Sequence, residues 1–182
     1  TPEAGRAALR ALELASSAAR AGHVQGIVFA PLNKHSLRVA GMTQEDELRY
    51  LAERLAVPGF VCEFNITGGL WTSRVTSHVP LKDVSGMLTQ DRIVENIALL
   101  TRGLRASGLE SPRVAVCGFN PHNGDGGAFG REEIDVIEPA VAEARRQGFP
   151  ADGPFPADTI FVRATRKDGQ GYDGVLTMFH DQ

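Results

Sequence analysis

The sequence contains little cysteine and no long apolar run. Its 182 residues include two cysteines, Cys62 and Cys117, with no CxxC pair. This pattern excludes a disulfide framework and a cysteine-rich metal site, and it indicates reduced thiols in a cytoplasmic protein. No apolar stretch reaches the roughly eighteen residues that a membrane span needs, and the first residues lack the pattern of a signal peptide. We therefore expect no membrane association.

An excess of positive charge is also absent. The sequence has 19 Lys and Arg against 22 Asp and Glu, a formal net charge of −3. Nothing in this balance indicates a surface for nucleic acid or for anionic lipid. A hydrophobic fraction of 42% is ordinary for a globular protein, and the length suffices for one core or two small ones.

The most informative stretch runs from Arg113 to Glu133. Its first part, Val114–Phe119, is an apolar run without polar alternation, which is typical of a strand buried on both faces. Its last part predicts a helix that begins near Glu132 and closes at Gly148. The loop between them places a histidine, a carboxylate and several glycines at the carboxyl end of a strand, the edge where open α/β sheets bind ligands.

Helices and strands alternate along the rest of the chain. Apolar residues at three-to-four spacing predict helices at residues 2–21, 45–55 and 89–106. Further short buried strands are predicted at residues 24–30, 59–65 and 174–179. The alternation predicts an α/β fold with an at least partly parallel sheet flanked by helices.

The remaining segments are less regular. Residues 70–79, rich in Trp, Thr, Ser and Val, could form an extended arm, and their hydroxyls suit a half-buried strand or a subunit contact. Residues 70–84 could mediate dimerisation. Residues 150–158 predict a Pro- and Gly-rich connection. Residues 159–162 suit either a short strand or the start of a helix.

Three histidines, His78, His122 and His180, stand at or just after the carboxyl ends of predicted strands. Such ends converge in an α/β fold, so the three imidazoles could meet and hold a divalent metal with an open coordination position. Nearby carboxylates could orient them: Asp125, Asp158 and Asp181. The alternative is three unrelated loop histidines, because no HExxH-type spacing ties them together.

The glycine loop and Lys34 each have two interpretations. Glycines before a helix can bind a phosphate through backbone N–H groups, although the dinucleotide fingerprint fails because Phe129 stands where its last glycine is required. The other interpretation is a tight turn that needs positive φ. Lys34 follows a buried strand and a proline, and it could bind a substrate anion, transfer a proton, or be simply solvated.

Six motifs in order resemble one known family. They are Ala30-Pro-Leu-Asn-Lys34, Ser77-His-Val-Pro-Leu81, Asn120-Pro-His-Asn-Gly-Asp-Gly-Gly127, Arg131-Glu-Glu-Ile-Asp135, Asp152-Gly-Pro-Phe-Pro-Ala-Asp158 and Met178-Phe-His-Asp-Gln182. Together they resemble the 4-hydroxythreonine-4-phosphate dehydrogenase family, including its four-carbon sugar-acid phosphate dehydrogenase relatives. The resemblance covers essentially the whole chain.

The resemblance implies a fold like that of isocitrate and isopropylmalate dehydrogenases, and a homodimer. It implies oxidation of a phosphorylated hydroxy acid, such as 4-phosphooxy-L-threonine in pyridoxal phosphate biosynthesis or a four-carbon sugar-acid 4-phosphate, followed by loss of carbon dioxide. NAD or NADP and a divalent metal (Zn, Mg, Mn or Co) would be the cofactors. The family's three metal ligands fall on His78, His122 and His180. Lys34 and Asp181 are the candidate catalytic residues.

Two departures from the family affect the expectation. Family members are nearly twice as long, so the chain resembles the central part of a longer fold. Where members have Gly-His-Thr-Glu, this chain has Gln44-Glu-Asp-Glu47, so Glu45 and Asp46 occupy the positions of a substrate-binding His-Thr pair. An acidic pair disfavours the same anionic contacts, which leaves the substrate's identity open.

The family holds its metal across the subunit interface. We expect His78 from one subunit and His122 with His180 from the other, because residues 70–79 look separate from the units that contain the other two histidines. Two further hypotheses are a three-histidine metallohydrolase that uses metal-bound hydroxide, and a non-catalytic part of the fold.

Overall fold

The computed structural model describes residues 1–166 and 168–182, and these form two compact units, Thr1–Val61 and Cys62–Gln182. Each unit is described below by itself.

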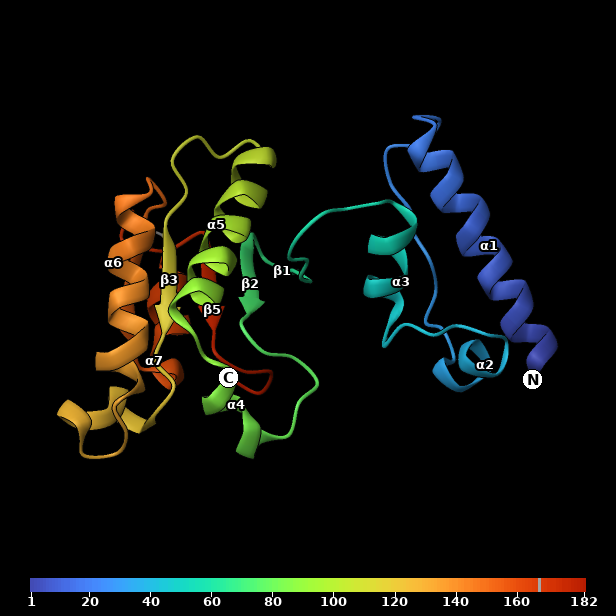
Figure 1. Ribbon diagram of the computed structural model, residues 1–182. Coiled ribbons are helices and arrows are strands. Elements are labelled where there is room, and N and C mark those ends of the chain that lie inside the picture. Colours follow the sequence, from blue (N-terminus) through green and yellow to red (C-terminus); the bar gives the residue numbers. More distant parts are fainter. Residues whose placement is uncertain (167) are drawn as a thin grey trace. The chain divides into compact units, whose positions relative to one another are not determined.

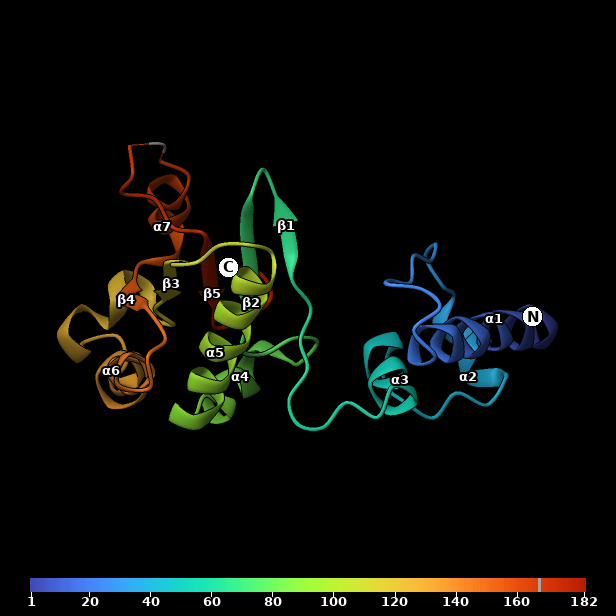
Figure 2. The same cartoon turned by 90° about the horizontal axis from the view of Figure 1, so that it is seen from above.

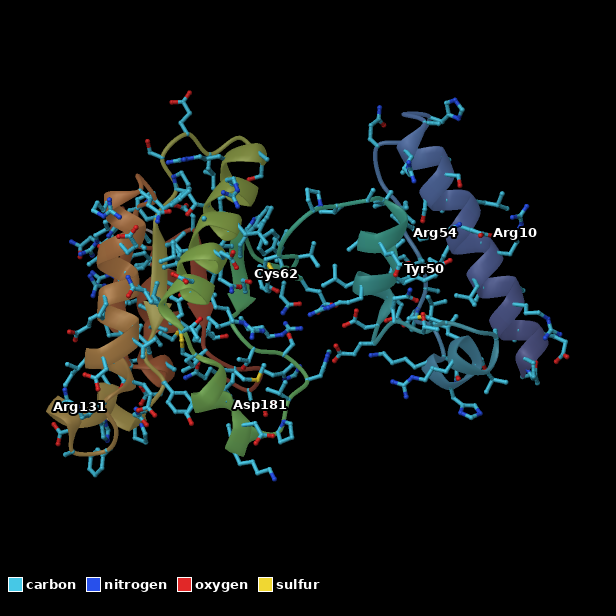
Figure 3. The ribbon with its side chains drawn as sticks, in the orientation of Figure 1. Arg10, Tyr50, Arg54, Cys62, Arg131 and Asp181 are labelled. Carbon is cyan, nitrogen blue, oxygen red and sulfur yellow. The ribbon has the colours of Figure 1, made fainter. Side chains whose placement is uncertain are left out.

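The first unit is helical. It contains α1 (Pro2–Arg20), α2 (Lys34–Val39) and α3 (Glu47–Arg54). Side chains cap all three helices, because the Thr1 hydroxyl, the Asn33 amide oxygen and the Asp46 carboxylate each accept a backbone N–H of the first turn. Ion pairs join Glu13 to Arg10 and to Arg54, whose guanidinium lies over the Tyr50 ring (Figure 3).

The predicted strand at residues 24–30 is wrong. This stretch has no regular secondary structure, and Val28 is fully exposed. A strand requires a hydrogen-bonded neighbour, and no strand of the described chain pairs with these residues. The apolar run has the composition of a buried strand, but composition alone does not show whether a neighbouring strand is present to pair with it.

The second unit contains a five-stranded sheet in the order β1-β2-β5-β3-β4 (Figure 1). Its strands are β1 (Asn65–Thr67), β2 (Leu70–Arg74), β3 (Val114–Cys117), β4 (Ala151–Phe155) and β5 (Gly174–Thr177). β1 pairs antiparallel with β2, and every other pairing is parallel. The prediction of a mostly parallel α/β sheet is confirmed.

Helices cover both faces of the sheet (Figure 2). α5 (Gln90–Ala106) and α6 (Glu138–Arg146) pack on one face, and α7 (Ala157–Ala164) packs on the other. Alternate residues of β3 point to opposite faces, since Val114 and Val116 join the core under α5 and α6 while Ala115 and Cys117 join the core under α7. Because β3 is buried on both faces, its sequence has no polar alternation.

Several local predictions for this unit need correction. The strand expected at residues 59–65 begins only at Asn65, and residues 70–74 form a half-buried strand inside the sheet, which is one of the alternatives expected for that segment. Residues 151–155 form β4, although Pro and Gly had indicated a connection. Ala157–Ala164 is helical, which resolves the ambiguity at residues 159–162 in favour of a helix. A short helix, α4 (Leu81–Met87), was not predicted.

None of the helices in the described residues is long and apolar enough to cross a membrane.

Candidate functional site

The candidate site lies where three parallel strands end. β2, β5 and β3 are neighbours and run in the same direction, so the segments that follow them meet at one edge of the sheet. His78 follows β2, His122 follows β3 and His180 follows β5, and all three side chains are exposed. The topology therefore brings these distant parts of the sequence to the same edge.

Two of the three histidines lie side by side. The ring centroids of His78 and His180 are 5.7 Å apart, with an angle of 41° between the rings. Nδ1 of His180 lies 2.8 Å from Oδ1 of Asp181, which leaves the other ring nitrogen available (Asp181 is labelled in Figure 3). An imidazole oriented by a carboxylate in this way is a common arrangement for a metal ligand.

This pair fits a divalent metal ion. A metal–nitrogen bond is about 2.1 Å long, so two rings that share one tetrahedral ion have centroids about 5.3 Å apart, and the 5.7 Å spacing of the His78–His180 pair is close to this value. Among the described residues of this one chain, however, no group of three His, Cys, Asp or Glu side chains is placed to hold a metal. His122 is therefore at the same edge without completing a three-ligand cluster.

His122 faces a cleft of about 690 Å³ on the same edge. The cleft is formed by the segments after β3 and β5 and by the start of α7, and its walls mix apolar and polar side chains. Its lining includes Phe119, His122, Asp158, Phe179, Asp181 and Gln182. A cleft of this size accepts a small organic ligand.

The loop that contains His122 has an unusual backbone. Six consecutive residues, His122 to Gly127, have positive φ, and the first five of them, His122 to Gly126, lie between 44° and 74°. His122, Asn123 and Asp125 are not glycines, and the left-handed conformation costs each of them roughly 1 kcal/mol. The expectation of a turn that needs positive φ is confirmed. The surrounding structure must stabilise this turn, which is typical of functional sites.

Glu133 holds the start of this loop. Its carboxylate is 1% exposed and accepts three hydrogen bonds, from the backbone N–H of Phe119 and of Asn120 (2.7 Å each) and from Asn120 Nδ2 (2.9 Å). A second carboxylate, Glu132, accepts a bond from the same amide nitrogen at 2.7 Å. Buried carboxylates are stable only with such donors.

A wide helical turn carries Glu133. Residues Glu133–Ile137 form one π-helical turn, in which the Glu138 N–H bonds to the Glu133 carbonyl five residues earlier. Pro139 follows and has no N–H for the carbonyl of Asp135, so the regular α-helical pattern cannot continue through this point.

Two more side chains tie the edge together. Gln182 Oε1 accepts the Met178 N–H at 2.7 Å, and Gln182 Nε2 donates to the Gly118 carbonyl at 2.9 Å, which joins the segments after β5 and β3. Asn123 Nδ2 donates to the Pro154 carbonyl at 2.9 Å. Sequence reasoning missed Glu133, Gln182 and Asn123 as positioning residues. In the sequence, Glu133 could be recognised only as an acidic residue in the first turn of a predicted helix.

The other predicted site residues are divided between the two units. Lys34 and Glu45 are exposed, while the Asp46 carboxylate accepts the Arg49 N–H at 2.8 Å and caps α3. In the second unit, Asp158 lines the cleft, and Asp125 is exposed on the left-handed turn. Their roles toward a substrate stay predictions.

Cys117 is not a candidate nucleophile. Burial raises the pKa of its thiol to about 12, so the reactive thiolate does not form near neutral pH.

Comparison with known proteins agrees with this architecture. The family model described as pyridoxal phosphate biosynthetic protein PdxA matches residues 1–182. A provisionally named 4-hydroxythreonine-4-phosphate dehydrogenase 2 of Pseudomonas aeruginosa is 56% identical over 178 residues, covering 98% of this chain and 52% of that protein. The 4-hydroxythreonine-4-phosphate dehydrogenase of Burkholderia vietnamiensis is 46% identical over 181 residues, covering 98% of this chain and 54% of that protein.

A solved structure gives the same result in three dimensions. The crystal structure of 4-hydroxythreonine-4-phosphate dehydrogenase from Klebsiella pneumoniae superposes with a TM-score of 0.90 at 36% identity. The match covers 100% of this chain and 55% of that one, so the chain spans about half the length of the proteins that it matches. On the family model, these relatives and this structure, the chain belongs to the pyridoxal phosphate biosynthetic protein PdxA family.

Proposed function

We propose that the protein oxidises the secondary alcohol of a phosphorylated hydroxy acid, using NAD or NADP and a divalent metal ion, and that the keto acid formed then loses carbon dioxide. The single observation that supports this most directly is the His78–His180 pair at the carboxyl edge of the sheet, beside the cleft. 4-Phosphooxy-L-threonine and four-carbon sugar-acid 4-phosphates are the candidate substrates. The names of the relatives include both classes, a 4-hydroxythreonine-4-phosphate dehydrogenase and a provisionally named D-threonate 4-phosphate dehydrogenase.

In this proposal each side chain has a defined task. His78 and His180 hold the metal, and Asp181 fixes the orientation of the His180 ring. A divalent ion bound there would lower the pKa of the substrate hydroxyl and stabilise the negative charge that develops as carbon dioxide leaves. A bound nicotinamide would supply the hydride acceptor, and Lys34 is the candidate for the base that would take the hydroxyl proton.

The position of the His78–His180 pair changes the expected division of the three histidines between two subunits. We expected His78 to be separated from His122 and His180 by the subunit interface, but His78 and His180 lie side by side in one chain. We now propose that these two come from one subunit of a homodimer and that His122 of the partner subunit completes the site. The exposure of all three histidines is compatible with this division.

Complementation between inactive variants distinguishes the possible divisions. In the full-length protein, a mixture of His78→Ala and His122→Ala subunits should recover about a quarter of wild-type activity, because half of the dimers are mixed and each has one intact site. A mixture of His78→Ala and His180→Ala should stay inactive, because no site then contains both residues. Recovery in the second mixture would restore the original division. Failure of both mixtures, despite subunit exchange, would place all three ligands in one chain.

The reaction itself is tested by reduced-nicotinamide absorbance. The full-length protein, with each metal and each cofactor, is given phosphorylated four-carbon hydroxy acids, and carbon dioxide release is followed in parallel. Hydrolysis of a phosphate or ester without NAD would favour the metallohydrolase. Metal and nicotinamide binding without any turnover would favour a substrate outside this panel, and binding of neither would favour a non-catalytic role.

A further inference from the structure

Arg74 is a buried cation close to the candidate metal ligands. It is the last residue of β2, and its side chain is 11% exposed. Arginine is rarely so buried unless its charge is compensated. The groups that bind this guanidinium should therefore explain why it is buried.

Its protein partners use only part of its hydrogen-bonding capacity. Nε donates to Ser77 Oγ at 2.7 Å, and Nη2 lies 2.6 Å from Glu63 Oε2. Nη1 has no partner among the described residues, and the Glu63 side chain is 51% exposed. Glu63 therefore meets the guanidinium from the solvent side through one bond, without the two-pronged pairing that arginine can make with a carboxylate.

Arg74 lines a small polar cavity of about 100 Å³. No carboxylate is among the lining residues, which are Asn65, Thr72, Ser73, Arg74, Phe161, Thr177, His180 and Gln182. The hydroxyl of Thr177 and the amide of Gln182 already bond to the backbone, so Arg74 is the one positively charged donor among the described residues of the lining, beside the neutral amide of Asn65 and the imidazole of His180. A cavity of this size and charge suits one small oxyanion.

The position of the cavity connects it to the site. His180 forms part of its wall, and the ring of His180 lies beside that of His78. Ser77, which accepts the Nε bond, directly precedes His78. An oxyanion at Arg74 would therefore lie next to the metal-binding pair.

We propose that Arg74 forms an oxyanion subsite that binds the carboxylate or the phosphate of the substrate next to His180. This inference rests on the proposed function for the identity of the molecule that contains the oxyanion. Binding of an oxyanion to this subsite can be measured without turnover.

The test is calorimetric titration of the full-length protein with two probes, inorganic phosphate and glycerate, a hydroxy acid without phosphate. Arg74→Met should weaken binding of the preferred probe by at least tenfold, and Arg74→Lys should restore only part of it because lysine lacks the planar fork. Selective loss of phosphate binding identifies the substrate phosphate, and selective loss of glycerate binding identifies the carboxylate. Arg146→Met, at an arginine 75% exposed on α6, is the matched control and should change neither.

Glu63→Gln gives an effect of opposite sign. Glutamine can still accept the Nη2 hydrogen bond, but it removes the negative charge that competes with the oxyanion for the guanidinium. It should therefore tighten binding of the preferred probe several-fold, and this variant remains informative if Arg74→Met does not fold. Unchanged affinities in Glu63→Gln and in a folded Arg74→Met would refute the subsite. Because the titration contains no nicotinamide, it tests the subsite independently of the reaction. Arg74-dependent binding, combined with no nicotinamide binding and no oxidation in the absorbance assay, would overturn the proposed function and leave the subsite standing.

Discussion

Replacing Glu133 by glutamine tests whether this buried carboxylate holds the loop that contains His122. Oε1 accepts the Phe119 and Asn120 N–H groups, and Oε2 accepts Asn120 Nδ2. Glutamine can keep its oxygen at the first position, but its NH₂ then faces the Asn120 NH₂. Asn120 cannot turn its amide over without directing an oxygen at the Glu132 carboxylate.

The expected loss is moderate. Hydrogen bonds to a charged group contribute about 1.5–3 kcal/mol each, and one is lost while two become neutral. Glutamine is neutral, so the free-energy cost of burying the charged carboxylate disappears and offsets part of this loss. We therefore expect a decrease of about 2 kcal/mol in the free energy of unfolding. For a domain of this size, that corresponds to a decrease in Tm of roughly 4–8 °C.

Two measurements check this expectation. Thermal unfolding by circular dichroism gives the stability, and hydrogen exchange of the Phe119 and Asn120 amides gives the local effect. Glu138→Gln, at an exposed carboxylate one turn further along, is the control and should change stability by less than about 0.5 kcal/mol. If Glu133→Gln matches this control and both amides stay protected, the carboxylate does not hold the loop.

Two further predictions concern neighbouring residues. Gly118→Ala would place a methyl group against Asn123 Oδ1 and 3.1 Å from Glu133 Oε1, so it should displace the left-handed turn that contains His122. Metal titration should then show a lower affinity, and an unchanged affinity would contradict this prediction. The Cys117 thiol, whose pKa burial raises from 9.0 to about 12, should resist iodoacetamide at pH 8 until the protein unfolds. Because the unfolded chain loses this proton first, stability should fall by about 1.4 kcal/mol per pH unit between pH 9 and 12, and Cys117→Ser should remove that component.

The sequence predicted those elements whose signals are local. The buried apolar run of β3 and the helix capped by Thr89 were predicted correctly, because burial on both faces and a hydroxyl cap can be recognised in a few adjacent residues. β4 was missed because Gly153 and Pro154 resemble a connection, although a strand at the sheet edge tolerates proline. The strand at residues 24–30 was wrong because pairing depends on a distant partner.

In the candidate site, too, the local features could be predicted from the sequence and the non-local ones could not. Three histidines at strand ends could be recognised, but the strand order that places β2 directly beside β5, and hence His78 beside His180, is a non-local property. The role of Glu133 was not predictable either, since it depends on the π-helical turn and on a loop fourteen residues earlier in the chain.

The turn from His122 to Gly126 has one further consequence, which concerns chirality. Its backbone dihedrals are those that a chain of D-amino acids would adopt readily, so over these five residues the protein contains a short piece of mirror-image helix. Substitution here is therefore limited by handedness more than by polarity. Glycine, asparagine and aspartate are tolerated, whereas valine, isoleucine or threonine would oppose the turn even where the environment suits them.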